Sequence, residues 1–263
     1  MDLLTSVLTD LDAESAWLDD IVGDLADAGW RTQTPAPGWT VAHQIAHLAW
    51  TDDQATAAAT NPDALAATLT DLLAGTVTVD SAAEARAGQR PPDLLEGWRA
   101  GRARLGEALA ATPQGTRLPW FGPPMSGTSM ATARLMETWA HGQDVADALG
   151  APHPAPAGLR HITYLVVRTR DYAFTTRGLA PPPDPFRIVL TSPDGAEWDW
   201  GPDDAPQRIA GTALDLCLLA TQRRHRSDTT LKAIGGDADL WLDIAQAFAG
   251  PPGEGRKPSS EHP

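Results

Sequence analysis

The first half of the chain repeats long amphipathic segments separated by short polar turns. Over residues 2–28 apolar residues recur every three or four positions, which predicts a helix that ends at the Ala28-Gly29 stop signal. Thr40 is the predicted N-cap of the second helix, and Gly150 follows the last one like a C′ glycine. The remaining helices are predicted over residues 41–59, 63–74, 91–112 and 130–150. Short connections between helices of this length favour an up-down bundle, with ligands projected inward from facing helices.

The pattern changes at a proline-rich stretch, residues 151–185, which holds two proline clusters around a helical segment. Beyond it, residues 186–192 and 196–201 alternate as strands around Pro193-Asp194-Gly195, a good hairpin turn. The rest of the pattern predicts a helix, a small strand with a turn, and a last helix, over residues 211–225, 234–236 and 240–248.

These elements predict a mixed fold, in which a four-helix bundle precedes a small α+β domain. The predicted boundaries are a bundle over residues 1–150, a linker with a connecting helix over 151–185, the α+β domain over 186–249, and a disordered tail over 250–263.

Composition narrows the class of protein. The 263 residues are 42% hydrophobic, enough for folded cores, and 34 acidic against 20 basic residues give a net charge of −14. Such a charge repels nucleic-acid phosphates and anionic lipid surfaces, so neither nucleic acid nor membrane is an expected partner. No run of about 18 apolar residues occurs, and the start lacks a signal-peptide pattern. A single cysteine excludes an intramolecular disulfide, and we expect a cytoplasmic protein.

Two helical pairs of polar residues could carry chemistry. Glu137 and His141 stand four residues apart in one predicted helix, and His43 and His47 do so in another. Residues with this spacing project from one helix face, so two such helices facing each other could close around a divalent metal. A chance match, or a core histidine with satisfied hydrogen bonds, is the alternative that spacing alone leaves open.

Two strings around these residues resemble known motifs. TPAPGWTVAHQIAHLAW and LMETWAHGQDVADALG are similar to the two metal-binding motifs of the DinB-like, mycothiol-dependent maleylpyruvate isomerase family. The resemblance implies a DinB-like bundle followed by a small α+β domain, where a helix like GTALDLCLLATQRR recurs. It also implies that His47, Glu137 and His141 are the metal ligands, and that Asp144 orients an imidazole from behind.

Three further residues have possible roles in catalysis, substrate binding or packing. His43 is interpreted as a catalytic acid or base, or as a packed residue, with a fourth metal ligand as the other alternative. Arg223 matches an arginine after the family's C-terminal helix and could contact an anionic substrate group, although it could equally offset a helix dipole. Cys217 lies in the apolar run LDLCLLA and is expected to be a core residue rather than a nucleophile.

The expected function is metal-dependent chemistry on a small electrophilic substrate. The three ligands suit Zn²⁺ first, with Ni or Fe as alternatives, and leave coordination positions open. The resemblance implies mycothiol as thiol cofactor and thiol transfer or isomerisation as the reaction. The alternatives are a thiol-independent hydrolase or ring-opening or ring-closing enzyme, and a binding or interaction module with a non-catalytic metal. Monomer and homodimer both remain open.

Overall fold

The computed structural model describes residues 2–261 and divides into two compact units, Met1–Pro156 and Ala157–Pro263. Met1 of the predicted bundle and the last two residues of the predicted tail, 262–263, lie outside the described residues. The first unit is helical, and the second combines helices with a four-stranded sheet. The predicted fold class, a helical bundle followed by a small α+β domain, is confirmed.

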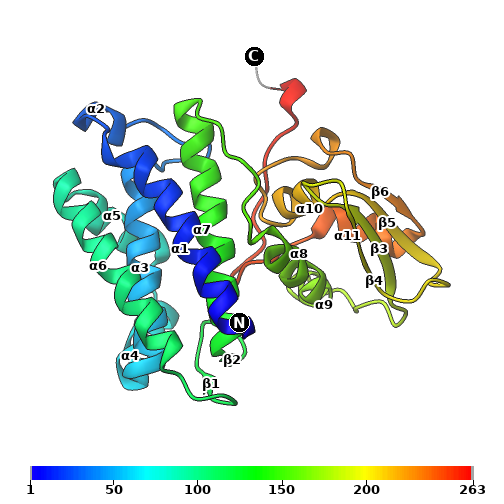
Figure 1. Ribbon diagram of the computed structural model, residues 1–263, viewed down its shortest axis with the longest axis horizontal. Helices are drawn as coiled ribbons and strands as arrows, with labels where there is room; N and C mark the ends of the chain where they lie inside the picture. Colours follow the sequence, from blue (N-terminus) through cyan, green and yellow to red (C-terminus); the bar gives the residue numbers. More distant parts are fainter. Residues whose placement is uncertain (1, 262–263) are drawn as a thin grey trace. The chain divides into compact units, whose positions relative to one another are not determined.

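Four long helices lie side by side in the first unit (Figure 1). They are α1 (Leu3–Gly23), α3 (Val41–Thr60), α6 (Pro91–Ala110) and α7 (Gly127–Leu149). The shorter elements are α2 (Asp27–Trp30), α4 (Pro62–Ala74), α5 (Val79–Ala87), β1 (Arg117–Leu118) and β2 (Met125–Ser126). Because α4, α5, α6 and α7 all contact α3, side chains on several of its faces are held in fixed positions.

The core of this unit joins the long helices through large apolar side chains. Leu18 of α1, Ile45 and Leu48 of α3, and Leu94 and Trp98 of α6 are buried in one cluster. Fully burying such a side chain stabilises the fold by about 1.5–3 kcal/mol. The apolar stripe of α3 therefore packs in the core with α1 and α6, while Gln44, His47 and Asp52 on α3 face partners on α7.

Two helix boundaries predicted for the first unit are wrong, and one helix was not predicted. The first helix ends at Gly23 rather than at residue 28, and the separate turn α2 places Trp30 in the core, which one continuous helix would not do. Helix α7 begins at Gly127, three residues early, because the Ser126 side chain accepts from the Ser129 N–H at 3.1 Å and caps the helix. Helix α5 was not predicted, since only Ala83 in it is buried and no apolar stripe marks it.

The second unit carries a sheet in the order β4-β3-β5-β6, with helices on one side of it (Figure 1). Its strands are β3 (Phe186–Thr191), β4 (Glu197–Trp200), β5 (Gln207–Thr212) and β6 (Lys232–Ile234). Its helices are α8 (Leu159–Arg168), α9 (Arg170–Thr175), α10 (Ala213–Ala220) and α11 (Gly236–Ile244), with short 3₁₀ turns at Arg226–Asp228 and Ser259–Glu261. The predicted β3–β4 hairpin is confirmed, with Thr191 opposite Glu197.

The observed sheet differs from the predicted elements of the second unit in two places. Strand β5 pairs in parallel with β3 and was not predicted, because its alternation is interrupted by Gly211. The helix expected over residues 211–225 is only Ala213–Ala220, since β5 runs on through Thr212. Gly201 bends the chain after β4 at φ +82°, where a Cβ would lie 2.0 Å from the Phe186 carbonyl oxygen, so only glycine fits.

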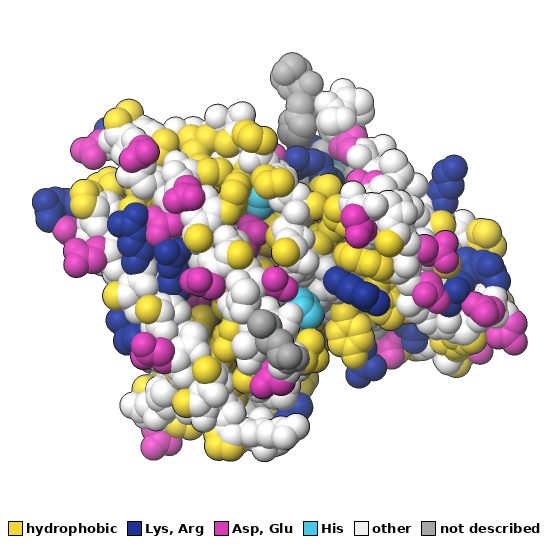
Figure 2. Space-filling model, viewed as in Figure 1, with side chains coloured by type: hydrophobic (Ala, Val, Ile, Leu, Met, Phe, Trp, Pro, Cys, Tyr) yellow, Lys and Arg dark blue, Asp and Glu magenta, His cyan; other side chains and the backbone are white. Residues whose placement is uncertain are grey.

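Among the described residues, no helix is both long and apolar enough to cross a membrane. On the face shown in Figure 2, acidic and basic side chains are interspersed over the helices of the first unit rather than gathered by sign. This mixture is typical of solvent-exposed helix faces.

Candidate metal centre

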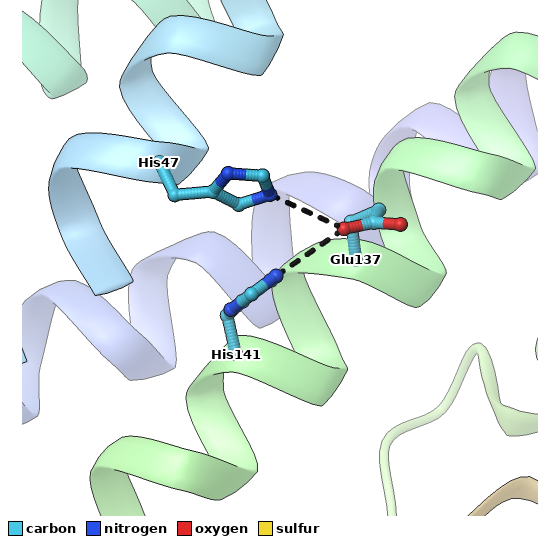
Figure 3. A group of neighbouring side chains, drawn as sticks. All are labelled: His47, Glu137 and His141. Carbon is cyan, nitrogen blue, oxygen red and sulfur yellow. Dashed lines mark ion pairs between the residues drawn. The ribbon is translucent and has the colours of Figure 1, made fainter. Parts of the chain in front are cut away.

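Helices α3 and α7 bring three side chains together inside the first unit (Figure 3). Glu137 Oε2 lies 3.6 Å from Nε2 of His47 and 3.3 Å from Nε2 of His141. One ligand atom from each residue lies within 4.8 Å of the others, so the group could hold a metal ion. The bundle thus unites residues that are 90 positions apart in the chain, His47 and Glu137.

A chain of hydrogen bonds sets the protonation of His141. Thr34 Oγ1 donates to the Trp39 carbonyl at 2.8 Å and accepts from Gln44 Nε2 at 2.8 Å. The amide oxygen of Gln44 therefore faces Nδ1 of His141, at 2.5 Å, and an amide oxygen can only accept. Nδ1 must carry a proton, so the neutral ring presents the lone pair of Nε2 to Glu137, as a metal ligand does.

Glu137 is a carboxylate in this setting. Burial alone raises the pKa of Glu137, but the interactions with His141 and His47, together with the charge of Arg134, hold it well below its usual range. A lone pair and a carboxylate oxygen repel each other unless a cation lies between them. The site therefore needs positive charge between the Glu137 and His141 side chains, either a proton or a metal ion.

The spacing of the three groups fits a metal ion. Zinc bonds of about 2.0–2.1 Å in a tetrahedron separate neighbouring ligand atoms by about 3.3 Å, close to the 3.3 and 3.6 Å observed here. The buried Nδ1 of His47 has no hydrogen-bond partner among the described residues. A metal ion at Nε2 would leave Nδ1 equally unpartnered, so this atom does not distinguish a metal ligand from a packed histidine.

His43 lies on the same helix but makes different contacts. Its Nδ1 accepts from the Thr40 backbone N–H at 3.2 Å at the start of α3. A backbone N–H only donates, so the ring proton is on Nε2, which donates to Glu84 Oε2 at 2.6 Å. Both nitrogens are therefore engaged, one in capping α3 and the other with an exposed carboxylate, and its catalytic role stays a prediction.

The other two predicted residues lie in different units. Asp144 is buried one turn after His141 on α7, which suits the predicted orienting role without testing it. Arg223 follows α10 in the second unit, where its guanidinium donates to the Thr221 carbonyl at 2.6 Å. Its contact with a substrate also stays a prediction.

Aromatic rings surround the imidazoles. The half-buried Trp39 stacks on His141 with ring centres 5.9 Å apart and lies 5.3 Å from the ring of His47. Its indole N–H donates to Asp80 Oδ1 at 3.0 Å, so α5 fixes both Trp39 and His43. Sequence reasoning missed Gln44, Asp80 and Glu84. Gln44 lies within the first of the two quoted strings but was not singled out there, and recognising α5 would have placed the two acids on one face.

Cys217 is a buried core residue of α10, which matches the sequence expectation. Burial raises the pKa of its thiol to about 12, although a contact with Thr163 opposes the shift. Since only the thiolate reacts, about one thiol in 10⁴ is ionised at about pH 8. We expect Ellman's reagent to label the native protein only as fast as it unfolds, and the denatured protein at once. Rapid native labelling at about pH 8 would contradict this assignment.

Different protein-family models match the first and the second unit of the chain. The family model described as "Mycothiol maleylpyruvate isomerase N-terminal domain" matches residues 11–146, and one described as "Wyosine base formation" matches residues 182–232. Two uncharacterised proteins of Mycobacterium tuberculosis, from strains CDC 1551 / Oshkosh and H37Rv, are each 55% identical over 250 residues. Each alignment covers 95% of this chain and 97% of the relative.

Solved structures share the fold at low identity. A crystal structure of the mycothiol-dependent maleylpyruvate isomerase superposes with a TM-score of 0.57 at 16% identity, and one of its mutants with 0.58 at 16%. Both cover 88% of this chain and 92% of the other. The similarity therefore extends over both units of the fold.

Proposed function

Because this chain belongs to the mycothiol maleylpyruvate isomerase family, we propose that it is a metal-dependent enzyme that uses mycothiol. The proposed reaction joins the thiol to a small electrophilic substrate, ending in thiol transfer or in isomerisation. One observation carries the proposal: the Nε2 atoms of two imidazoles face a single carboxylate oxygen, at 3.3 and 3.6 Å.

His47, Glu137 and His141 would hold the metal, with Zn²⁺ favoured by two imidazoles and one carboxylate. Bound there, a divalent metal would supply a Lewis acid that lowers the pKa of a coordinating thiol or water. Three protein ligands leave a position open for such a group, whereas a closed structural site has four.

The neighbouring side chains would orient a ligand, cover the imidazoles and supply a group that moves a proton. Gln44 holds the His141 ring in the tautomer whose Nε2 faces the centre. Trp39 covers the two imidazoles on one side and excludes water there. His43 shares its Nε2 proton with Glu84 at the edge of α5, and a shift of Glu84 would free that nitrogen to move a proton to or from a substrate.

Replacing His43 by alanine distinguishes its three possible roles, namely acid or base, packed residue and fourth metal ligand. We expect the variant to keep full metal content, because both ring nitrogens have partners other than the metal ligands. Turnover should fall about 10²-fold or more if the ring moves a proton. Metal analysis together with kcat checks this, and Glu84→Gln is the control that removes the carboxylate and keeps the imidazole. Loss of metal in His43→Ala would make His43 a fourth ligand.

The function is tested by turnover of metal-loaded protein with an electrophilic substrate, with and without mycothiol. We expect product only with the thiol, and none after removal of the metal by a chelator. Product without thiol would contradict thiol dependence and favour a metal-dependent hydrolase. Full metal content without any turnover over a panel of electrophiles would favour a binding module.

A further inference from the structure

Helix α5 is attached to the bundle mainly through polar side chains. Of its residues Val79–Ala87, all described by the structure, only Ala83 is buried. The helix lies against α3 (Figure 1), and Arg86 Nη2 pairs with Asp53 Oδ2 at 2.8 Å, where the two side chains are 31% and 34% exposed. Exposed ion pairs contribute little to stability, and little apolar surface is buried here. Helix α5 therefore belongs to the parts of the first unit that detach most easily.

Two acids on α5 bind residues that lie beside the metal ligands. Asp80 Oδ1 accepts from the Trp39 indole N–H at 3.0 Å, and Glu84 Oε2 accepts from His43 Nε2 at 2.6 Å. The two acids stand four residues apart and project from one helix face. Both hydrogen bonds are exposed to solvent, so water can replace either partner at a small cost in free energy.

The ring of Trp39 covers the two imidazoles of the metal centre. It stacks on His141 with 19° between the ring planes, and its centre lies 5.3 Å from that of His47. The side chains of His47 and His141 are only 10% and 12% exposed. Trp39 precedes α3 in the chain, and its side chain can turn about its own bonds without displacing either ligand.

Short connections that contain glycine border α5 on both sides. Gly75 ends α4 at φ +70°, and Gly88 follows the last residue of α5. Hinge motion is absorbed by a few residues at the ends of elements, which are often small. Helix α5 can therefore move as one piece between α4 and α6.

We propose that α5 is a lid on the metal centre, and that Asp80 and Glu84 are positioning residues that hold Trp39 and His43 in the closed arrangement. When α5 detaches, both hydrogen bonds are lost together. Trp39 then turns away from the imidazoles, and His43 Nε2 becomes available to a substrate. The closed state excludes water and the open state admits the substrate. This inference rests on the proposed metal centre and names the element that controls access to it.

The test measures access to the imidazoles without metal and without turnover. Diethyl pyrocarbonate acylates neutral imidazoles, and peptide mass spectrometry measures how fast it labels His47 and His141 in the metal-free full chain. Labelling through a minor open state is proportional to its population. Asp80→Ala removes the acceptor of the Trp39 N–H and should speed labelling of both histidines about threefold to tenfold. Asp80→Asn should label like the parent protein, because its amide oxygen still accepts.

Asp63→Ala is the matched control. Asp63 is also an exposed acid in the first turn of a helix, α4, so its loss affects the helix dipole in the same way. It should change the labelling rate by less than about twofold. Hydrogen exchange gives a second measurement that needs no variant: we expect the amides of α5 to exchange faster than those of α3 in the parent protein.

Other results would overturn the proposal. They are unchanged labelling in Asp80→Ala, equal acceleration by Asp63→Ala, equal acceleration by Asp80→Asn, or exchange in α5 as slow as in α3. Circular dichroism checks that the variants keep their helices. A protein that binds no metal or turns over no substrate would leave the labelling and exchange results unaffected, so a failure of the proposed function is distinguishable from a failure of the lid.

Discussion

Glu137→Ala should lower the affinity of the protein for its divalent metal by at least about 10²-fold. Changing a group that merely supports a ligand costs 10–100-fold, and removing a ligand costs more. Glu137 is also the carboxylate that pairs with both imidazoles, so its loss leaves two neutral donors without it. Metal analysis after dialysis against a metal buffer checks the affinity, and circular dichroism checks that the helices persist.

Metal-dependent stabilisation gives a second measurement of the same variant. A ligand present at 100 times its Kd stabilises the folded state by about 2.7 kcal/mol, so added Zn²⁺ should raise the Tm of the parent protein and not that of Glu137→Ala. Glu84→Gln is the control, because this acid lies at the edge of the site and its side chain is 75% exposed. Retained metal in Glu137→Ala would reject the ligand set.

Asp52→Asn should reduce the free energy of unfolding by about 3–5 kcal/mol, the cost of leaving a buried charge without its partner. Arg134 on α7 donates from Nε to Asp52 Oδ1 on α3 at 2.9 Å, and the two side chains are 1% and 4% exposed. Burial raises the pKa of Asp52 even though Arg134 opposes the shift, which reflects the desolvation cost that the pairing offsets. Denaturant unfolding of metal-free protein measures the change.

Asp53→Asn is the matched control for this experiment. Asp53 is the next residue and also pairs with arginines, Arg86 at 2.8 Å and Arg104 at 3.3 Å, but its side chain is 34% exposed. An ion pair in that setting contributes about 0–1 kcal/mol, so the control should change stability little. Adding Arg134→Met to Asp52→Asn should restore part of the loss. Equal losses of unfolding free energy in Asp52→Asn and Asp53→Asn would show that burial does not determine how much the Asp52–Arg134 pair contributes to stability.

The Asp52–Arg134 pair and the metal centre join the same two helices. His47 and Asp52 come from α3, and Arg134 and Glu137 from α7. The buried ion pair holds these helices together about a turn from the ligands. A loss of Asp52 should therefore weaken metal binding as well as folding, because the site depends on the relative position of α3 and α7.

Several features of this protein follow from sequence pattern alone. Apolar spacing predicts the long helices, because an amphipathic helix must bury its stripe whatever its neighbours are. The strings around His47 and His141 identify the family, and their order along the chain predicts the ligand set. The turn at Pro193-Asp194-Gly195 predicts the β3–β4 hairpin, since pairing between adjacent strands is local.

Tertiary structure decided the rest, for a common reason: the determining contacts lie far apart in sequence. Gln44 meets His141 across 97 positions, so no local pattern indicates which group sets the tautomer of the ligand. Helix α5 lacks an apolar stripe, yet it fixes Trp39 and His43 through Asp80 and Glu84. Local periodicity reports what each segment must bury, but only the packed chain determines which polar groups meet.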